Sequence, residues 1–313
     1  MLINISLLVI GFILLMKGAD VFVEGASKVA AMFRIPQIVI GLTIVAFGTS
    51  APEAAVSIAS AFKGTAGIAI GNIIGSNIAN VLLILGLSGI IGSLVIKKNT
   101  YKIETPYVIL ITFVLLGLGY FDGNISHFDG VILWVFFLLF LLYLYRLTKQ
   151  GNDSAIDDVP ELEESDRLWK LILMIVLGII CVVIGSQVTV DAASAIAKEF
   201  GVSERIIGLT IVSIGTSLPE LVTSVNASFK GKTDIAIGNI IGSNIFNVLF
   251  VLGTASLVSP QPIPFAGSFL IDCIISIGAI LLFMVFIGKD MKLKRYGALA
   301  MFISYIAYIF YIL

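Results

Sequence analysis

Charged residues are scarce in this chain of 313 residues. Asp, Glu, Lys and Arg make up 12% of it, against 58% hydrophobic residues and a mean hydropathy of +1.09. Soluble globular domains are about a quarter charged and about half apolar. The shortage of charge excludes a water-soluble globular protein. It predicts an integral membrane protein whose partner is the lipid bilayer and not nucleic acid.

Histidine and cysteine are almost absent. The one histidine, His127, lies in a predicted external loop beside Asp122 and Asp129, and the two cysteines, Cys181 and Cys273, fall inside predicted spans. Zinc and copper sites need Cys or His ligands, so a site for such metals within the membrane is disfavoured. Cysteines placed in this way favour small core residues over a disulfide or a metal pair.

Long apolar runs take the place of charge. A membrane-spanning helix needs roughly 20 apolar residues, and the sequence offers ten such runs. They cover residues 3–31, 36–61, 67–92, 104–121, 129–147, 168–197, 204–228, 234–258, 266–287 and 295–312. The first run has neither a basic region before it nor a small-residue cleavage site. We therefore predict a retained helix and not a signal peptide.

Lysine and arginine are distributed unevenly between these runs. With the N-terminus outside, 15 of the 19 fall on the cytoplasmic side and one, Lys17, lies inside a span. Only Lys63, Lys198 and Arg205 then lie outside. The positive-inside rule therefore predicts a multi-pass protein of the plasma membrane, with both termini outside and the central loop in the cytoplasm.

One stretch of the chain occurs twice. Residues Gly41–Gly86 and Gly208–Gly253 align without a gap at an offset of 167, and 30 of the 46 positions are identical. Each half holds five spans, and five is odd, so the second half enters the membrane from the opposite side. We predict an all-α membrane protein of ten transmembrane helices, arranged as two inverted five-helix repeats over residues 1–149 and 168–313.

An acidic segment separates the two halves. Residues 150–167 carry seven carboxylates, and no lysine or arginine occurs between Gln150 and Asp166. The acids lack the glycine-punctuated spacing of a calcium loop. We therefore predict a solvated cytoplasmic linker, and a regulatory cation site is the less favoured alternative.

The second and seventh runs each contain a proline, Pro52 and Pro219. A proline inside a helix cannot donate to the carbonyl four residues back, which predicts free carbonyls at Gly48 and Gly215. Lipid tolerates such a break only where protein or a polar cavity satisfies the backbone. Discontinuous helices at matching positions of two halves are typical of a transport site.

The side chains around each break offer oxygen. They are Thr49, Ser50 and Glu53 in one copy and Thr216, Ser217 and Glu220 in the other, together with loosened carbonyls near Ala46 and Ser213. Calcium takes about six to eight oxygen ligands. A carboxylate within the membrane is costly and indicates function, although a neutral carboxyl that hydrogen-bonds between helices is the structural alternative.

A second motif, GN-x-x-GSN-I-x-N, follows in each copy. Its glycines and serines give one small, polar helix face that allows close packing. Asn72, Asn77, Asn239 and Asn244 fit helix packing as well as ion binding. Ser76, Asn80, Ser243 and Asn247 lie deeper in their spans, and we expect them to line an ion site. In the first span, Lys17, Asp20 and Glu24 are spaced for pairs within one helix.

GTSAPE and GTSLPE, each followed by the second motif, resemble the two alpha-repeats of the calcium/cation antiporter superfamily, closest to its microbial sodium/calcium exchangers. The resemblance covers nearly the whole chain. The calcium ligands that it implies are Glu53, Glu220 and the carbonyls of Thr49 and Thr216. The sodium positions that it implies are Ala46, Ser50, Ser76, Ser213, Ser217 and Ser243, with both glutamates shared, and the central polar pair is Asn80 and Asn247.

This resemblance implies a secondary active transporter that exchanges sodium for calcium by alternating access, with three sodium ions per calcium ion. It implies no enzyme activity and no cofactor. Proton or potassium coupling is the alternative. Some members of the superfamily carry Asp at the position of Asn247, and an amide there argues against potassium coupling. The proton-coupled branch lacks the TSxP run. The long first and sixth spans are implied to slide against the remaining helices.

Two other classes of function are open to the sequence. A passive cation channel commonly needs an oligomeric ring of carbonyls or acids, whereas an inverted repeat gives one chain access to both sides, so we expect a monomer. An intramembrane hydrolase would need a base, and no histidine shares a span with a serine. Charge balance favours exchange, because two buried carboxylates without a cation are strongly destabilising.

Overall fold

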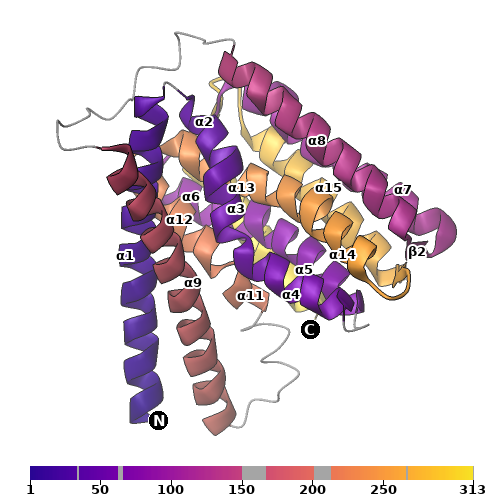
Figure 1. The fold of residues 1–313 in the computed structure, drawn as a ribbon, viewed down its shortest axis with the longest axis horizontal. Helices are drawn as coiled ribbons and strands as arrows, with labels where there is room; N and C mark the ends of the chain where they lie inside the picture. Colours follow the sequence, from indigo (N-terminus) through magenta and orange to yellow (C-terminus); the bar gives the residue numbers. More distant parts are fainter. Residues whose placement is uncertain (34, 63–65, 150–166, 201–212, 266, 313) are drawn as a thin grey trace.

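The computed structural model describes residues 1–33, 35–62, 66–149, 167–200, 213–265 and 267–312, and these are mostly helical (Figure 1). The first half comprises the helices α1 (Leu2–Met32), α2 (Gln37–Ile40), α3 (Ala46–Thr49), α4 (Ala51–Phe62), α5 (Ala66–Ala79), α6 (Gly86–Ile91), α7 (Thr105–Asp122) and α8 (His127–Lys149). The second half comprises α9 (Leu168–Glu199), α11 (Ser213–Thr216), α12 (Leu218–Phe229), α13 (Thr233–Phe246), α14 (Gly253–Val258), α15 (Gly267–Phe286) and α16 (Arg295–Ile312).

Segments of π-helix interrupt several of these helices. They are η1 (Gly41–Val45), η2 (Asn80–Leu85), η3 (Thr100–Glu104) and η6 (Asn247–Leu252). The segments η2 and η6 begin at residues that correspond at the offset of 167. A π-helical turn widens a helix locally and is frequent at functional sites. Hydrophobic periodicity does not reveal such turns, and the sequence did not predict them.

Seven described helices are long and apolar enough to cross a membrane. They are Leu2–Met32, Ala69–Ile91, Thr100–Asp122, His127–Lys149, Leu168–Thr189, Thr233–Val258 and Phe269–Phe286. An eighth candidate consists of Gln37–Thr49 and Ala51–Ile58, which are bent by 51°. These eight match eight of the ten predicted runs. The predicted run 204–228 lies partly outside the described residues, and the run 295–312 forms α16.

Burial separates central spans from peripheral ones. The most apolar window of Thr233–Val258 is 94% buried and that of Ala69–Ile91 is 78% buried, whereas only 19% of the window in Leu2–Met32 is buried. The chain segment α13–η6 and its counterpart α5–η2 therefore form the centre of the molecule. Most side chains on these two segments are buried within the protein.

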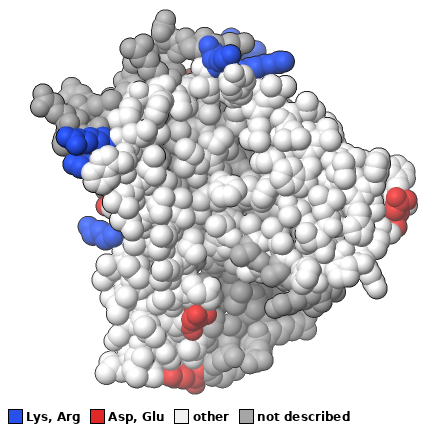
Figure 2. Space-filling model, viewed as in Figure 1, with Lys and Arg blue, Asp and Glu red and all other residues white. Residues whose placement is uncertain are grey.

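Two short antiparallel ladders join the halves. Strand β1 (Leu94–Val95) pairs with β4 (Lys292–Leu293), and β2 (Asn124–Ile125) pairs with β3 (Ile263–Pro264). Each ladder ties a loop of the first half to a loop of the second. On the face drawn in Figure 2, Lys and Arg lie at the upper end and along the left edge, and Asp and Glu lie mainly at the lower end and the right edge.

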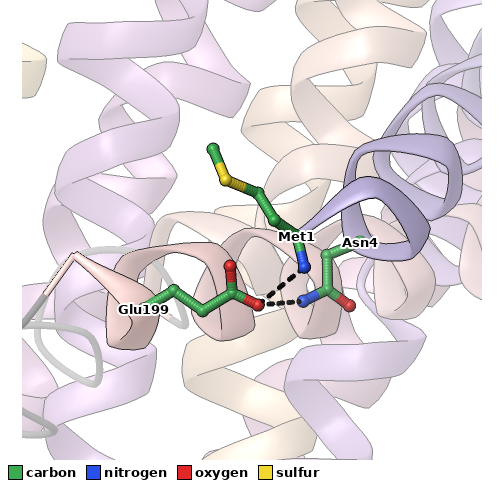
Figure 3. Close-up of polar contacts among 3 residues, drawn as sticks. All are labelled: Met1, Asn4 and Glu199. Atoms are coloured by element: carbon green, nitrogen blue, oxygen red, sulfur yellow. Dashed lines mark hydrogen bonds and ion pairs between the residues drawn. The ribbon is translucent and has the colours of Figure 1, made fainter.

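Helices α1 and α9 lie side by side and antiparallel at one edge (Figure 1). Gly18 allows this close approach, because a Cβ there would lie 2.7 Å from the Cβ of Cys181. At the lower end the Met1 amino group and the Asn4 amide donate to Glu199 Oε1 at 2.9 and 3.3 Å (Figure 3). The two helices are thus held together along their length and at this end.

The charged residues of α1 differ from the expectation in part. Glu24 pairs with Lys28 one turn later, at 3.3 Å, which is an intrahelical pair. Asp20 instead reaches the second half of the chain, where it forms an ion pair with Lys230 and accepts a hydrogen bond from Asn226 at 3.1 Å. Spacing along one helix does not reveal such a partner, because the pair depends on how α1 packs against α12.

Candidate functional site

The two helix breaks meet at the centre of the molecule, and each break falls at a serine. Helix α3 ends at Thr49 and α4 begins at Ala51, while α11 ends at Thr216 and α12 begins at Leu218. The sequence predicted that both prolines lie inside helices, and this prediction is wrong. They lie in the first turns of α4 and α12, where a missing N–H leaves no bond unmade. Each break therefore precedes its proline.

Each serine at a break donates to the glutamate of the opposite half. Ser50 Oγ donates to Glu220 Oε1 at 2.7 Å, and Ser217 Oγ donates to Glu53 Oε1 at 3.0 Å. The glutamates are 1% and 0% exposed. Both lie in the first turn of a half-helix, where the partial positive charge of the helix N-terminus favours an anion. The two carboxylates are therefore brought together by crossed hydrogen bonds.

The central helices add a second layer of hydroxyls and amides. Ser217 Oγ also lies 3.2 Å from Ser76 Oγ, and Ser243 Oγ donates to Glu220 Oε1 at 3.4 Å. Thr49 Oγ1 donates to Asn239 Oδ1 at 2.9 Å, and Thr216 Oγ1 donates to Asn72 Oδ1 at 3.4 Å. The protons of these two threonine hydroxyls are thus directed at amide oxygens of the central helices.

Asn72 and Asn239 are in turn held by serines. Asn72 Nδ2 donates to Ser57 Oγ at 3.0 Å, and Asn239 Nδ2 donates to Ser224 Oγ at 2.8 Å. The sequence left the role of these two asparagines undecided between packing and ion binding. The structure places them behind the threonines of the breaks. Their presence in a repeated motif was the only signal, and it could not separate the two roles.

Four asparagines join the central helices. Asn80 Nδ2 donates to Asn244 Oδ1 at 2.9 Å, and Asn247 Nδ2 donates to Asn77 Oδ1 at 3.1 Å. Asn77 and Asn244 each donate to the backbone carbonyl of the other, at 3.2 and 3.3 Å. All four are at most 2% exposed. The cluster therefore bridges α5–η2 and α13–η6 without access to bulk water.

Eight buried side-chain oxygens have no hydrogen-bond partner within the described part of the chain. Glu104 Oε2 and the hydroxyls of Ser88, Thr105 and Thr223 are four of them. The other four belong to the two glutamates beside the breaks and to the asparagine cluster, and they are Glu53 Oε2, Glu220 Oε2, Asn80 Oδ1 and Asn247 Oδ1. A buried oxygen without a partner is strongly unfavourable. Two of these last four belong to carboxylates, so a cation bound there would satisfy both the hydrogen-bond deficit and the charge. All four are oxygens, which suits hard cations such as calcium and sodium.

Two predicted ligands fit less simply. The carbonyl of Ala46 is not loosened, because it accepts the amide of Ser50 at 3.0 Å. The reason is that the break falls at Ser50, so α3 keeps this last bond. Ser213 begins α11, and its side chain lies outside the described residues. Within the described residues no group of three or more His, Cys, Asp and Glu side chains could hold a metal.

Fold and site together place the chain among helical membrane transporters. The profile of the sodium/calcium exchanger protein family matches residues 3–146 and again residues 170–313. The chain is 33% identical over 98% of its length to sodium/calcium exchanger MaX1 of Methanosarcina acetivorans, 97% of which is covered. The chain therefore belongs to the sodium/calcium exchanger family of antiporters, which is not an enzyme family.

Other similarities agree on the membrane setting and differ on the coupling ion. Inner membrane protein YrbG of Escherichia coli (strain K12) is 37% identical, over 88% of this chain and 87% of that protein. The Ca(2+)/H(+) antiporter ChaA of Bacillus subtilis is 28% identical, over 80% and 76%. The solved structure of the sodium-calcium exchanger NCX_Mj, soaked with sodium and strontium, matches with a TM-score of 0.83, 32% identity and 98% coverage of both chains.

Proposed function

We propose that this protein exchanges sodium for calcium across the plasma membrane by alternating access. The observation that carries the proposal is the set of four unpartnered acceptor oxygens around two buried glutamates. One calcium ion or two sodium ions neutralise the two carboxylates, and a third sodium ion adds one net positive charge. An empty site leaves both anions in low dielectric without compensation. Only the loaded protein then crosses between the outward-open and inward-open states, so the two ions must alternate.

The proposed ligands are those that the family resemblance implies, and the crossed bonds around Glu53 and Glu220 support the central part of the set. Calcium binds Glu53, Glu220 and the carbonyls of Thr49 and Thr216. The sodium ions bind around Ala46, Ser50, Ser76, Ser213, Ser217 and Ser243 and share both glutamates. Asn80 and Asn247 complete the centre. Three sodium ions per calcium ion move one net charge, and each such charge responds to voltage by about 2.3 kcal/mol per 100 mV.

We further propose that the chain consists of ten spans in two inverted five-helix repeats, 1–149 and 168–313. Three observations support this arrangement. The family profile matches twice at ranges that differ by 167 at both ends, since 170 − 3 and 313 − 146 both equal 167. The hydrogen bond from Ser50 to Glu220 becomes that from Ser217 to Glu53 under the same offset. The four asparagines likewise exchange in pairs.

The two ladders support the inverted relation as well. Adding 167 to β1 gives residues 261–262, next to β3, and adding it to β2 gives 291–292, at β4. The pair β1·β4 therefore corresponds to the pair β3·β2. Because α7 separates β1 from β2, a spanning α7 places the two ladders on opposite faces of the membrane. A twofold axis in the membrane plane produces this relation.

Proteoliposomes with imposed ion gradients test the exchange. We expect an outward sodium gradient to drive calcium uptake against its own gradient, and potassium or proton gradients of equal size to drive none. Flux driven by protons alone would replace sodium with the coupling of the ChaA-like relatives. A passive channel could not move calcium against its gradient under any of the three conditions. Calcium uptake against its gradient therefore distinguishes an exchanger from a channel.

Thiol labelling tests the orientation. In a variant without Cys181 and Cys273, we expect Asp122→Cys to react with a membrane-impermeant reagent applied to intact cells. We expect Lys289→Cys to react only after the membrane is opened, because its loop lies on the side of the 15 basic residues. Both positions are exposed. Reversed labelling would place the termini in the cytoplasm.

A further inference from the structure

The asparagine cluster fixes the direction in which each amide points. A backbone carbonyl can only accept a hydrogen bond, so the Asn77 atom at 3.2 Å from the Asn244 carbonyl must be Nδ2. Asn77 Oδ1 is therefore the atom that faces Asn247 at 3.1 Å, and Asn247 must present Nδ2 to it. The Oδ1 of Asn247 is thereby turned away from Asn77. It is one of the eight buried oxygens without a partner in the described part of the chain.

The same sequence of constraints runs in the other direction. Asn244 Nδ2 donates to the Asn77 carbonyl at 3.3 Å, so Asn244 Oδ1 accepts from Asn80 Nδ2 at 2.9 Å. The Oδ1 of Asn80 is then left without a partner. Asn80 lies one helical turn after Ser76, and Asn247 one turn after Ser243. Residues four apart share a helix face, so both free oxygens lie on the faces that carry the serines next to the glutamates.

From this arrangement we propose that Asn77 and Asn244 are positioning residues for cation binding. Asn77 orients Asn247 so that the amide oxygen of Asn247 faces the ion. Asn244 orients Asn80 in the same way. The proposal rests on the proposed function, because it assumes that a cation binds at this centre. It assigns to the middle asparagines of the motif a role in affinity that packing alone does not require.

The crossed arrangement separates positioning from packing. An asparagine that only packs two helices together affects both halves alike. An asparagine that orients one amide loses its effect when that amide is absent. A double-mutant cycle detects the difference, because coupled residues show an interaction energy and independent ones are additive. The cycle that tests positioning therefore combines a change at Asn77 with a change at Asn247, which lies in the other half. A change at Asn80, in the same half as Asn77, is the uncoupled comparison.

The experiment measures the apparent Kd for calcium from the calcium-dependent rise in melting temperature of the full chain. This readout does not depend on transport. We expect Asn77→Ala to weaken calcium binding about fivefold to tenfold, the effect of losing one orienting hydrogen bond. In an Asn247→Ala background the same change is expected to add nothing. In an Asn80→Ala background it is expected to have its full effect.

A second variant guards against misfolding of the first. Asn244→Ala should show the mirrored pattern, with no added effect in Asn80→Ala and a full effect in Asn247→Ala. The control is Thr112→Val, a buried change in α7 whose hydroxyl bonds only within its own helix, and it should leave the Kd unchanged. Equal effects in both backgrounds would overturn the positioning role alone. A wild-type chain without any response to calcium would overturn the proposed function as well.

Discussion

Replacing Glu53 with glutamine is expected to reduce sodium-driven calcium uptake to the background of empty vesicles. Glutamine keeps the shape of the side chain and can still accept from Ser217, so the local fold survives. It removes one of the two negative charges that balance calcium. Loss of a buried charged partner costs about 3–5 kcal/mol, which corresponds to a loss of affinity of more than about a hundredfold. Calcium-45 uptake into proteoliposomes measures the effect.

The same substitution is expected to lower calcium uptake but to raise the melting temperature of the protein without cations. Without calcium or sodium, the Glu53→Gln variant should melt at a higher temperature than the wild type, because one of two neighbouring buried anions has been removed. Added calcium should then raise its melting temperature less than that of the wild type. Function and stability without cations thus change in opposite directions, which simple misfolding cannot produce.

The matched control is Glu104→Gln. Glu104 is also buried, at 1% exposure, but it lies at the end of η3 and bonds to Tyr143, away from the helix breaks. The same chemical change there should leave sodium-driven uptake largely intact. Normal uptake by Glu53→Gln, or equal loss in both variants, would contradict the assignment of Glu53 as a cation ligand.

The sequence predicted which residues meet at the two helix breaks because its signals are chemical. Glu53 and Glu220 stand out as carboxylates in apolar spans, and the repeated prolines mark helix breaks. The structure confirms a broken helix before Pro52, with a bend of 51°. The repeat also pairs the residues in advance, so a hydrogen bond in one half predicts its counterpart. These inferences need only residue type and spacing.

The remaining features depend on three-dimensional contacts that spacing does not encode. Asn77 and Asn80 have the same side chain three residues apart, and both donate to Asn244 of the other half, yet only Asn80 leaves its amide oxygen without a partner. The π-helical turn at Asn80 shifts the residues after it by one position, which periodicity does not show. The intact carbonyl bond at Ala46 likewise depends on where the break falls, one turn later.

The crossed bonds have a mechanical consequence. Each glutamate takes its orientation partly from a serine of the other half, so neither half presents a complete site alone. Ser50 and Ser217 lie at the breaks themselves, where the backbone has least helical restraint. A movement of the half-helix that carries one serine therefore changes the orientation of the glutamate in the other half. In the exchange proposed above, this arrangement would couple ion loading to the relative position of the two halves.

Replacing Gly242 with valine is expected to lower calcium uptake by about tenfold or more. A Cβ at Gly242 would lie 2.8 Å from the Cα and the carbonyl oxygen of Leu42, and 2.8 Å from the Cβ of Ala46. Backbone atoms cannot move aside as a flexible side chain can, so α13 must shift away from η1 and α3. The shift displaces Ser243, the next residue, which donates to Glu220.

The control for this prediction is Gly278→Val in α15. Within the described residues, a Cβ there meets nothing within 4 Å, so the same substitution adds no clash while it has the same effect on helix propensity. We expect uptake by this variant to stay within about twofold of the wild type. Overpacking at Gly242 should also destabilise the chain by roughly 1–3 kcal/mol, seen as a lower melting temperature. Equal uptake by the two valine variants would show that close contact between α13 and η1 does not set the geometry of the cation site.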